Sequence, residues 1–237
     1  EFYDKNERNR ANLTQEIRLS MGSIIMGGYF KQLIEQDEAM GYLYGGAATD
    51  ATSHYDFLVA AGYGQYGVNL TPSLKLKANV RFENNSIKYE GTSQGLNDYW
   101  EKIKLPPINF YIDHAMIGYR TSLHYLKDKF TSFYGSVSQG YKSGGVNQQP
   151  YLSDTSRPFD PEFIQNFEVG LNRVTNIYRT QLSAFYSLRK DQQVSLSSQQ
   201  VEGDPNSFLF YTGNAGSGTI QGFEWENTLN VSSNLYM

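Results

Sequence analysis

The chain has 237 residues, a formal net charge of −4, 15% aromatic residues and no cysteine. Without cysteine it can hold no disulfide framework, no thiolate metal site and no thiol nucleophile, and its acidic balance lacks the basic footprint of nucleic-acid binding. No run approaches the 18 or more apolar residues of a membrane-spanning helix, which excludes a helical membrane protein.

The composition leaves two β-rich classes open. The chain uses 19 tyrosines, 14 phenylalanines and 22 glycines, yet its mean hydropathy is −0.53. A transmembrane β-barrel has such a composition because its polar lumen residues offset its lipid-facing ones. A soluble, secreted β-rich binding domain has a similar composition.

Strand-like runs with a period of two follow one another along the chain. We predict strands at 11–20, 23–32, 57–70, 74–89, 114–125, 130–142, 163–174, 178–196 and 219–231, with a cut-off tenth that begins at Leu235. Segment 31–40 is highly charged and is predicted as a solvated loop, with a short helix as the alternative.

The fourth run gives the clearest alternation. Its even positions from Leu74 to Phe82 are apolar, whereas Lys75, Lys77 and Arg81 lie between them. The run 178–196 continues a similar pattern over an unusual length. Soluble strands average about five or six residues, but a tilted strand that crosses a bilayer needs roughly ten. The length of these runs therefore indicates a membrane.

The connections between the predicted strands alternate in length. Short turns lie at 21–22, 71–73, 127–129, 175–177 and 232–234, and long segments lie at 33–56, 90–113, 143–162 and 197–218. An up-and-down meander with tight turns at one end and long loops at the other is typical of outer-membrane barrels. A soluble sandwich has no physical reason to keep all its long loops at one end.

The number of strands indicates an incomplete barrel. Nine full strands and one stub form an odd set, whereas bacterial single-chain barrels have even numbers. We predict an all-β fold: an antiparallel up-and-down transmembrane β-barrel that is partial, with about nine or ten strands of a larger barrel. Open sheet edges are not tolerated in lipid, so we expect this piece to aggregate or fail to insert on its own.

Five separated motifs follow one another along the chain: TQEIRLS (Thr14 to Ser20), FYGSVSQGYKSGGVN (Phe133 to Asn147), FDPEFIQNFEVGLN (Phe159 to Asn172), AFYSLRKDQQ (Ala184 to Gln193), and NAG with GFEWE (Asn214 to Gly216 and Gly222 to Glu226). In this order they resemble the barrel of TonB-dependent outer-membrane receptors. The resemblance covers nearly the whole chain. It implies that 1–237 is a partial barrel domain, without the family's N-terminal plug domain and without the aromatic barrel C-terminus.

Several residues of these motifs have a physical explanation. We expect Gly170 and Gly222 to relieve crowding or permit a bend on the lumen side. Glu168, Glu224 and Glu226 fall on polar strand faces and should point into a wet interior. Aromatic residues near strand ends suit interfacial girdles, and those predicted are Tyr125, Phe130, Tyr134, Tyr178 and Trp225.

The resemblance also implies a function. The parent protein would lie in the outer membrane of a Gram-negative bacterium, bind a scarce nutrient outside and import it, with a ferric siderophore first and cobalamin or a glycan as alternatives. Its expected partners are outer-membrane lipid, the TonB energy-transducing protein through the absent plug domain, and a small-molecule nutrient such as a metal chelate. We expect no nucleic acid, cofactor, metal site or catalytic residue.

Ligand contacts in such receptors come from outer loops and the upper lumen. The candidates are Tyr42 and Tyr44 in the first long loop, and Tyr141 and Lys142 at the mouth of the sixth strand. A tyrosine offers a stacking surface with a hydrogen-bonding tip, and Lys142 could attract an anionic chelate.

Two other readings of the sequence are considered. A soluble extracellular β-sandwich that binds carbohydrate through aromatic loops would bury its apolar faces against each other. An outer-membrane barrel hydrolase would need a nucleophile and a base, for which His124 is the one histidine predicted on an inward strand face. His54, His114 and His124 show no metal-like spacing, and 213–218 lacks the Lys-Ser/Thr of a phosphate loop.

Overall fold

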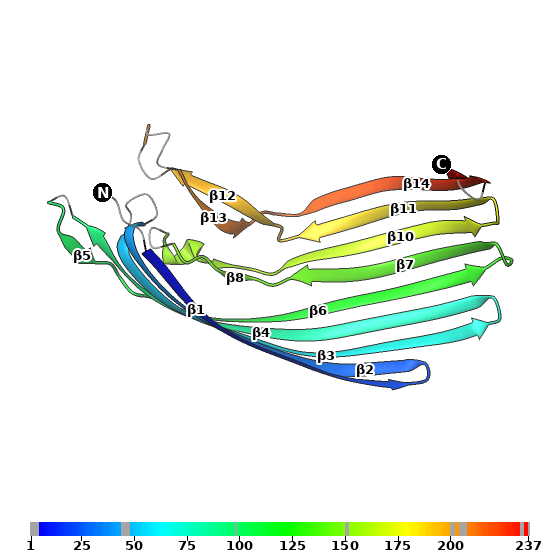
Figure 1. The fold of residues 1–237 in the computed structure, drawn as a ribbon, viewed down its shortest axis with the longest axis horizontal. Helices are drawn as coiled ribbons and strands as arrows, with labels where there is room; N and C mark the ends of the chain where they lie inside the picture. The colour runs from blue at the N-terminus through cyan, green and yellow to red at the C-terminus, as the bar shows by residue number, and fades with distance from the viewer. Residues whose placement is uncertain are drawn as a thin grey trace.

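The computed structural model describes residues 5–43, 48–97, 99–149, 152–199, 202–203, 208–232 and 235–236. They form one large antiparallel sheet in which strands that follow one another in the chain pair in order (Figure 1). Its strands are β1 (Lys5–Met21), β2 (Ile24–Leu43), β3 (Ala48–Thr71), β4 (Leu74–Leu96), β6 (Ile108–Leu126), β7 (Thr131–Lys142), β10 (Glu162–Val174), β11 (Tyr178–Lys190), β14 (Gly218–Ser232) and β15 (Leu235–Tyr236).

The remaining elements lie in the long connections at one end of the sheet. β5 (Lys102–Lys104) pairs with β4, β8 (Gly145–Val146) with β9 (Pro158–Phe159), and β12 (Gln193–Gln199) with β13 (Phe208–Asn214), while η2 (Asp154–Ser156) is a single 3₁₀ turn. Short turns join the strands at the opposite end (Figure 1). The predicted arrangement holds for the later connections, but β2 ends at Leu43 and β3 begins at Ala48, so the first connection predicted as long is short.

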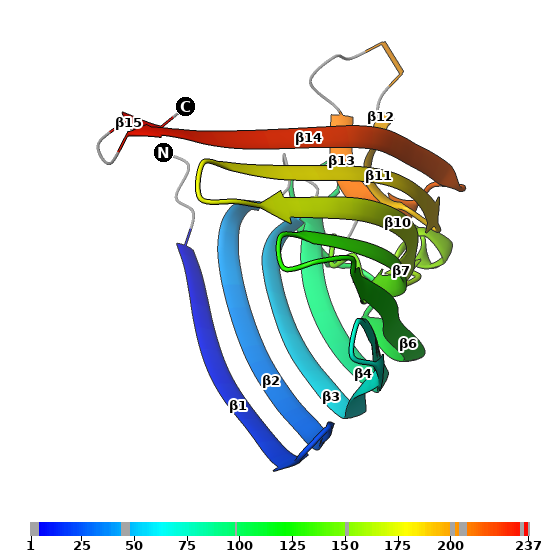
Figure 2. The same ribbon diagram turned by 90° about the vertical axis from the view of Figure 1, so that its right-hand side faces the viewer.

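The sheet is a curved wall rather than a closed cylinder. Figure 2 shows the strands following an open arc from β14 through β6 to β1. In the described part of the chain, β1 pairs only with β2 and β15 only with β14. The prediction of a partial antiparallel barrel is thus confirmed.

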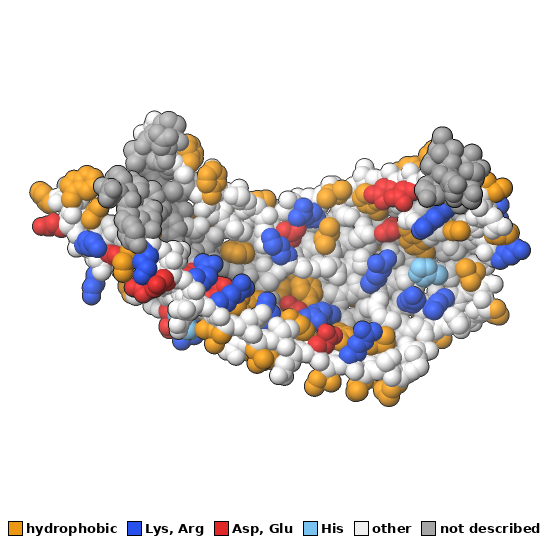
Figure 3. Space-filling view, viewed as in Figure 1, with side chains coloured by type: hydrophobic (Ala, Val, Ile, Leu, Met, Phe, Trp, Pro, Cys, Tyr) orange, Lys and Arg blue, Asp and Glu red, His pale blue; other side chains and the backbone are white. Residues whose placement is uncertain are grey.

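The register separates the wall into a polar and an apolar face, because directly opposed residues point to the same side. One row across six strands reads Lys77, Ser122, Ser136, Glu168, Phe185 and Gly222. The adjacent row reads Leu76, Leu123, Gly135, Val169, Ala184 and Phe223. Figure 3 looks onto the concave side, where charged side chains of both signs are spread along the wall.

The apolar, convex face has no protein layer over it among the described residues. Ile17, Phe82 and Phe223 expose 72%, 59% and 65% of their surface. On β4 the apolar positions run from Leu74 to Phe82, eight steps of ~3.3 Å or roughly 26 Å along the strand. At a tilt of roughly 40° this is about 20 Å along the membrane normal, most of the ~25 Å apolar band of outer-membrane barrels. Among the described residues no second sheet packs against this face, so the β-sandwich reading is wrong, and the exposed apolar side chains suit contact with hydrocarbon.

Several boundaries and one side-chain direction differ from the sequence predictions. β2 continues to Leu43 and β3 begins at Ala48, so 31–40 is strand rather than loop or helix and most of 33–56 is paired. The charges fit a strand there because both faces stand in water beyond the apolar band. The run 178–196 breaks into β11 and β12 at Asp191, which has a φ of 54°. Tyr134 points to the concave side rather than to an interfacial girdle, and its hydroxyl donates to Glu168 Oε1 at 2.6 Å.

The described residues contain no helix that is long and apolar enough to span a bilayer.

Candidate ligand site at the loop end of the wall

The concave face carries an apolar cluster where the strands rise beyond the apolar band. Ile87 and Tyr89 of β4 are 0% and 3% exposed, and Ile108 and Val146 complete the buried cluster. Val146 belongs to the long connection after β7, which folds back over the wall and covers β4 and β6. Partly buried residues packed around the cluster are Tyr55, Phe57, Phe110 and Ile112.

Two aromatic residues of β3 extend this cluster. The rings of Tyr55 and Phe57 lie 6.2 Å apart, and the ammonium group of Lys31 lies 5.9 Å from the Phe57 ring centre. Burial, with a smaller contribution from the charge of Glu35, raises the pKa of Tyr55 to about 12. Its phenol is therefore protonated at any physiological pH and can donate a hydrogen bond.

A cavity of about 110 Å³ lies beside this cluster on the concave face. The Arg8 guanidinium at its edge makes two hydrogen bonds to the Asp37 carboxylate, both 2.7 Å long. The Ser93 side chain lines the cavity, and its buried hydroxyl has no hydrogen-bond partner among the described residues. A buried hydroxyl without a partner costs about 1–3 kcal/mol, so this cavity favours a polar occupant. Other residues that line it are Asn6, Ser53, Tyr89 and Gln148.

Asn147 joins the two long connections above this cavity. Its side-chain amide donates to the carbonyl oxygens of Thr212 at 2.7 Å and Arg157 at 3.1 Å, and its Oδ1 accepts the Thr212 N–H at 2.9 Å. The Asn147 side chain thus pairs with backbone groups in the way that a strand between β8 and β13 would. It is 6% exposed, so these bonds are shielded from water.

Two further side chains strengthen the same junction. The Asn214 amide donates to the carbonyl oxygens of Asp160 and Asp191 at 3.0 and 2.8 Å, and the Gln193 amide donates to those of Ser143 and Asp160 at 2.8 and 3.1 Å. Together with Asn147 they tie connection 143–161 to connection 191–217. These two connections are therefore joined into one hydrogen-bonded body, which we call the loop platform.

Glu162 anchors the loop platform to the strands. Its carboxylate accepts hydrogen bonds from the Arg189 guanidinium and from the Gln193 N–H, the latter at 2.9 Å. Burial alone would raise the pKa of Glu162, but these two donors outweigh burial and lower its pKa below the ordinary value. The carboxylate is therefore ionised at neutral pH and holds the first turn of the platform in place.

The two predicted contacts at the end of β7 have different surroundings. The Tyr141 hydroxyl donates to Glu83 Oε2 and accepts from Arg81 Nε, each at 3.1 Å. Its ring lies over Gly118, where a Cβ atom would come within 3.0 Å of it. The Lys142 side chain is exposed and makes no ion pair with a described carboxylate.

The glycine pair after Lys142 is explained by close packing. A Cβ atom at Gly144 would collide with the carbonyl oxygen of Phe159 and with the His114 ring, and one at Gly145 would collide with the Phe159 ring. Ser143 Oγ lies 2.7 Å from the side-chain amide of Asn85. The chain can cross the wall this closely only because both residues lack a side chain.

The other predicted contacts come from the end of β2. Tyr42 lies within strand β2 rather than in a loop, and its side chain lies outside the described part. Tyr44 lies outside the described residues. The structure therefore places the Tyr141 hydroxyl beside Arg81 and Glu83, and all four predicted ligand contacts stay predictions.

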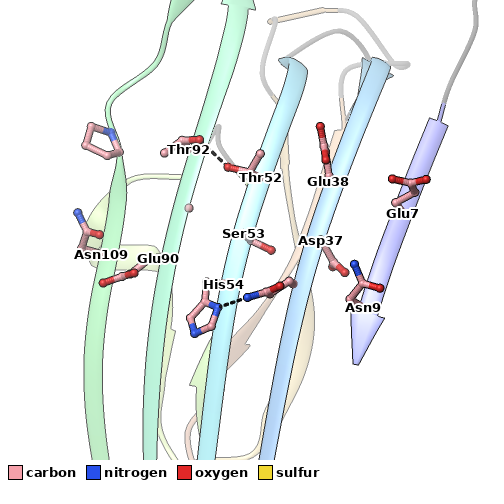
Figure 4. Close-up of a pocket in the computed structure, with 13 residues that line it drawn as sticks. Glu7, Asn9, Asp37, Glu38, Thr52, Ser53, His54, Glu90, Thr92 and Asn109 are labelled. Atoms are coloured by element: carbon pink, nitrogen blue, oxygen red, sulfur yellow. Dashed lines mark hydrogen bonds between the residues drawn. The ribbon is translucent and has the colours of Figure 1, made fainter. Parts of the chain in front are cut away.

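A second cavity, of about 530 Å³, lies across β1 to β6 and is lined mainly by residues of the convex face (Figure 4). Glu7, Glu38, His54 and Glu90 come from four strands, and the His54 ring lies 3.4 Å from the Gln36 amide. No group of three His, Asp or Glu side chains in the described ranges could hold a metal ion. The cavity is acidic and lies outside the wall.

Sequence reasoning missed Asn147, Glu162, Gln193 and Asn214, although all four fall within the quoted motifs. For Asn147, Glu162 and Asn214 the signal was an amide or carboxyl side chain near a glycine or proline in a segment read as a loop, whereas Gln193 fell within the predicted strand 178–196. A single sequence gives no reason to pair two segments that lie 65 residues apart, as Asn147 and Thr212 do.

Comparisons with known proteins agree with this architecture. A family model described as "TonB dependent receptor-like, beta-barrel" matches residues 1–236. The pesticin receptor of Yersinia pestis is 29% identical over 136 residues, which are 56% of this chain and 19% of that receptor. The chain therefore spans about a fifth of the length of this relative.

Solved structures share the fold at low sequence identity. The ferric yersiniabactin uptake receptor FyuA from Yersinia pestis superposes with a TM-score of 0.74 at 19% identity, covering 97% of this chain and 34% of that one. The copper transporter OprC gives 0.65 at 11% identity, covering 98% and 37%. The siderophore receptor PiuA from Acinetobacter baumannii gives 0.62 at 12% identity, covering 96% and 37%.

Proposed function

The chain belongs to the TonB-dependent receptor β-barrel family, a family of outer-membrane transport receptors rather than enzymes, and from this premise we propose that it forms part of a receptor that imports a scarce nutrient. We propose a ferric siderophore as the nutrient, because receptors for such chelates are among the similar structures. Cobalamin and glycans are the alternatives. The proposed action is binding followed by energised, gated passage, with no bond made or broken.

The cavity on the concave face supports a binding role most directly. It combines the Arg8 guanidinium, the unpartnered hydroxyl of Ser93 and the apolar wall around Tyr89 within reach of one small molecule. Ligand sites commonly have this composition, with apolar walls and a few placed polar groups. A metal chelate with carboxylate or phenolate oxygens would accept hydrogen bonds from these donors.

The residues at the end of β7 are proposed to assist. Lys142 would attract an anionic chelate toward the mouth, and Tyr141 would hold the wall beneath it through Arg81 and Glu83. Tyr42, at the end of β2, and Tyr44 remain proposed contacts. Energy would come from the TonB protein through a plug domain, as in the family.

A growth and binding experiment on the full-length receptor tests this proposal. Cells that lack other siderophore receptors would express it under iron limitation and receive, one at a time, a panel of ferric siderophores, cyanocobalamin or maltooligosaccharides. We expect one ferric siderophore to restore growth. Arg8→Gln should weaken its binding, measured by intrinsic fluorescence, by roughly tenfold or more, since a charge-assisted hydrogen bond contributes about 1.5–3 kcal/mol.

Lys5→Gln is the matched control, because Lys5 lies on the same strand but pairs with Glu7 on the convex face. It should leave binding unchanged. Growth supported by cobalamin or an oligosaccharide and by none of the chelates would contradict the siderophore proposal.

A further inference from the structure

The lipid-facing column of β10 ends in an arginine. Every second residue along this strand points outward, and the column reads Phe167, Val169, Leu171 and Arg173 toward the short-turn end. Phe167 and Val169 are exposed on the convex face, at 43% and 61%. An arginine in such a column is stable only where it reaches the polar interface or an anionic partner.

Contacts of the guanidinium fix its position but leave donors unused. Arg173 Nε donates to the Tyr178 hydroxyl at 2.6 Å and Nη1 donates to Thr131 Oγ1 at 3.4 Å. Within the described chain, no carboxylate forms an ion pair with Arg173. The carboxylate of Asp128 in the adjacent turn uses Oδ1 to accept the N–H groups of Phe130 and Thr131, and it attracts the Arg173 guanidinium from beyond ion-pair distance.

A second cation lies in that turn. The Val174 N–H donates to the Phe130 carbonyl oxygen at 2.8 Å, so the turn before β7 and the end of β10 are side by side. The Lys129 ammonium lies 4.8 Å from the Phe130 ring centre. Exposed apolar residues at the same ends of β6, β7 and β10 and in the turn after β10 are Tyr125, Phe130, Phe133, Val174 and Ile177. Aromatic and cationic side chains in this combination are typical of the membrane–water interface.

We propose that Arg173 and Lys129, with the hydroxyl of Tyr178, bind the phosphate group of a phospholipid in the periplasmic leaflet. The short turns of outer-membrane barrels lie on the periplasmic side. A guanidinium presents a planar set of donors that matches phosphate, and basic residues at a membrane surface attract anionic headgroups. The apolar column of β10 ends directly at Arg173, so the acyl chains of a lipid whose phosphate binds there would lie along Leu171 and Phe133.

The test uses the full-length receptor in a neutral detergent, independently of any imported nutrient. Native mass spectrometry would measure retention of phosphatidylglycerol, of diacylglycerol with the same chains, and of inorganic phosphate. We expect phosphatidylglycerol to bind. Diacylglycerol, which lacks the phosphate, and inorganic phosphate, which lacks the acyl chains, should each bind at least tenfold more weakly. The double variant R173Q/K129Q should lose at least tenfold in phosphatidylglycerol affinity.

Arg120→Gln is the matched control, since Arg120 lies on the concave face opposite Asn79 and cannot reach lipid. Arg173→Lys, which keeps the charge but not the planar donors, should bind with intermediate affinity and serves if the double variant does not fold. Equal phosphatidylglycerol binding by R173Q/K129Q and the wild type would overturn the proposal. Equal affinity for inorganic phosphate, or an equal loss in Arg120→Gln, would overturn it as well.

Discussion

Glycines on the two faces of the wall differ in what a side chain would meet at their positions. On the concave face, a Cβ atom at Gly170 would collide with the Tyr134 ring, and one at Gly222 would come within 2.7 Å of the Phe185 ring. These glycines leave room for an aromatic ring of the neighbouring strand, which agrees with the predicted relief of crowding on the lumen side. On the convex face, a Cβ atom at Gly62 would meet nothing within 4 Å.

This contrast predicts that replacing glycine by alanine changes stability by different amounts on the two faces. Gly170→Ala should lower the free energy of unfolding by about 1–3 kcal/mol, because Tyr134 must move and its bond to Glu168 is strained. Gly62→Ala should change it by less than about 1 kcal/mol, since the added methyl group enters open space and the unfolded chain loses freedom. Denaturant titration of the detergent-solubilised receptor measures both. A loss at Gly62 as large as that at Gly170 would refute the ring-packing explanation.

At the scale of elements, the loop platform turns two long connections into one body. Strand pairing alone would leave connections 143–161 and 191–217 independent. The side chains of Asn147, Gln193 and Asn214 supply the missing backbone partners, which is how irregular chain segments satisfy their polar groups away from water. A concerted platform would hold the concave cavity in one shape for its ligand.

The platform should loosen in acid because of Glu162. A carboxyl with a lowered pKa contributes stability that is present above its unfolded value, near 4.3, and is lost as the pH falls through the folded value. Hydrogen exchange at Gln193 and in β13 should therefore stay slow from pH 7 to about 5 and accelerate below about 4.

Glu162→Gln removes this titration while keeping a side chain of the same shape. In this variant, exchange should be faster at pH 7 and should no longer depend on the ionisation of residue 162, after correction for intrinsic exchange. Unchanged protection in the variant at neutral pH would show that the Arg189 contact does not anchor the platform.

For the whole molecule, the two faces of the wall differ strongly in how well they tolerate a charged side chain. Convex residues meet hydrocarbon, where a charge has no partner, whereas concave residues meet the polar lumen. Val80 and Asn79 are adjacent in β4 and lie on opposite faces, opposite Tyr119 and Arg120 respectively. They allow this difference to be measured at one depth.

Val80→Lys should destabilise the folded barrel by about 2–4 kcal/mol if it lies near the midplane, whereas Asn79→Lys should cost much less. Heat-modifiable migration on gels and the yield of receptor in outer-membrane fractions report the difference. Similar yields for the two variants would mean that lipid does not cover the convex face.

The alternation of side chains and of connection lengths by itself determined that this chain is a membrane-facing antiparallel wall and which face of its clearest strands is apolar. That information is local, since a period of two follows from strand geometry. Only the tertiary structure decided that charged segment 31–40 continues as strand, that Tyr134 turns inward over Gly170, and that Asn147 reaches Thr212. These outcomes depend on contacts between segments far apart in the chain, and nothing in a local pattern specifies which distant backbone group a side chain meets.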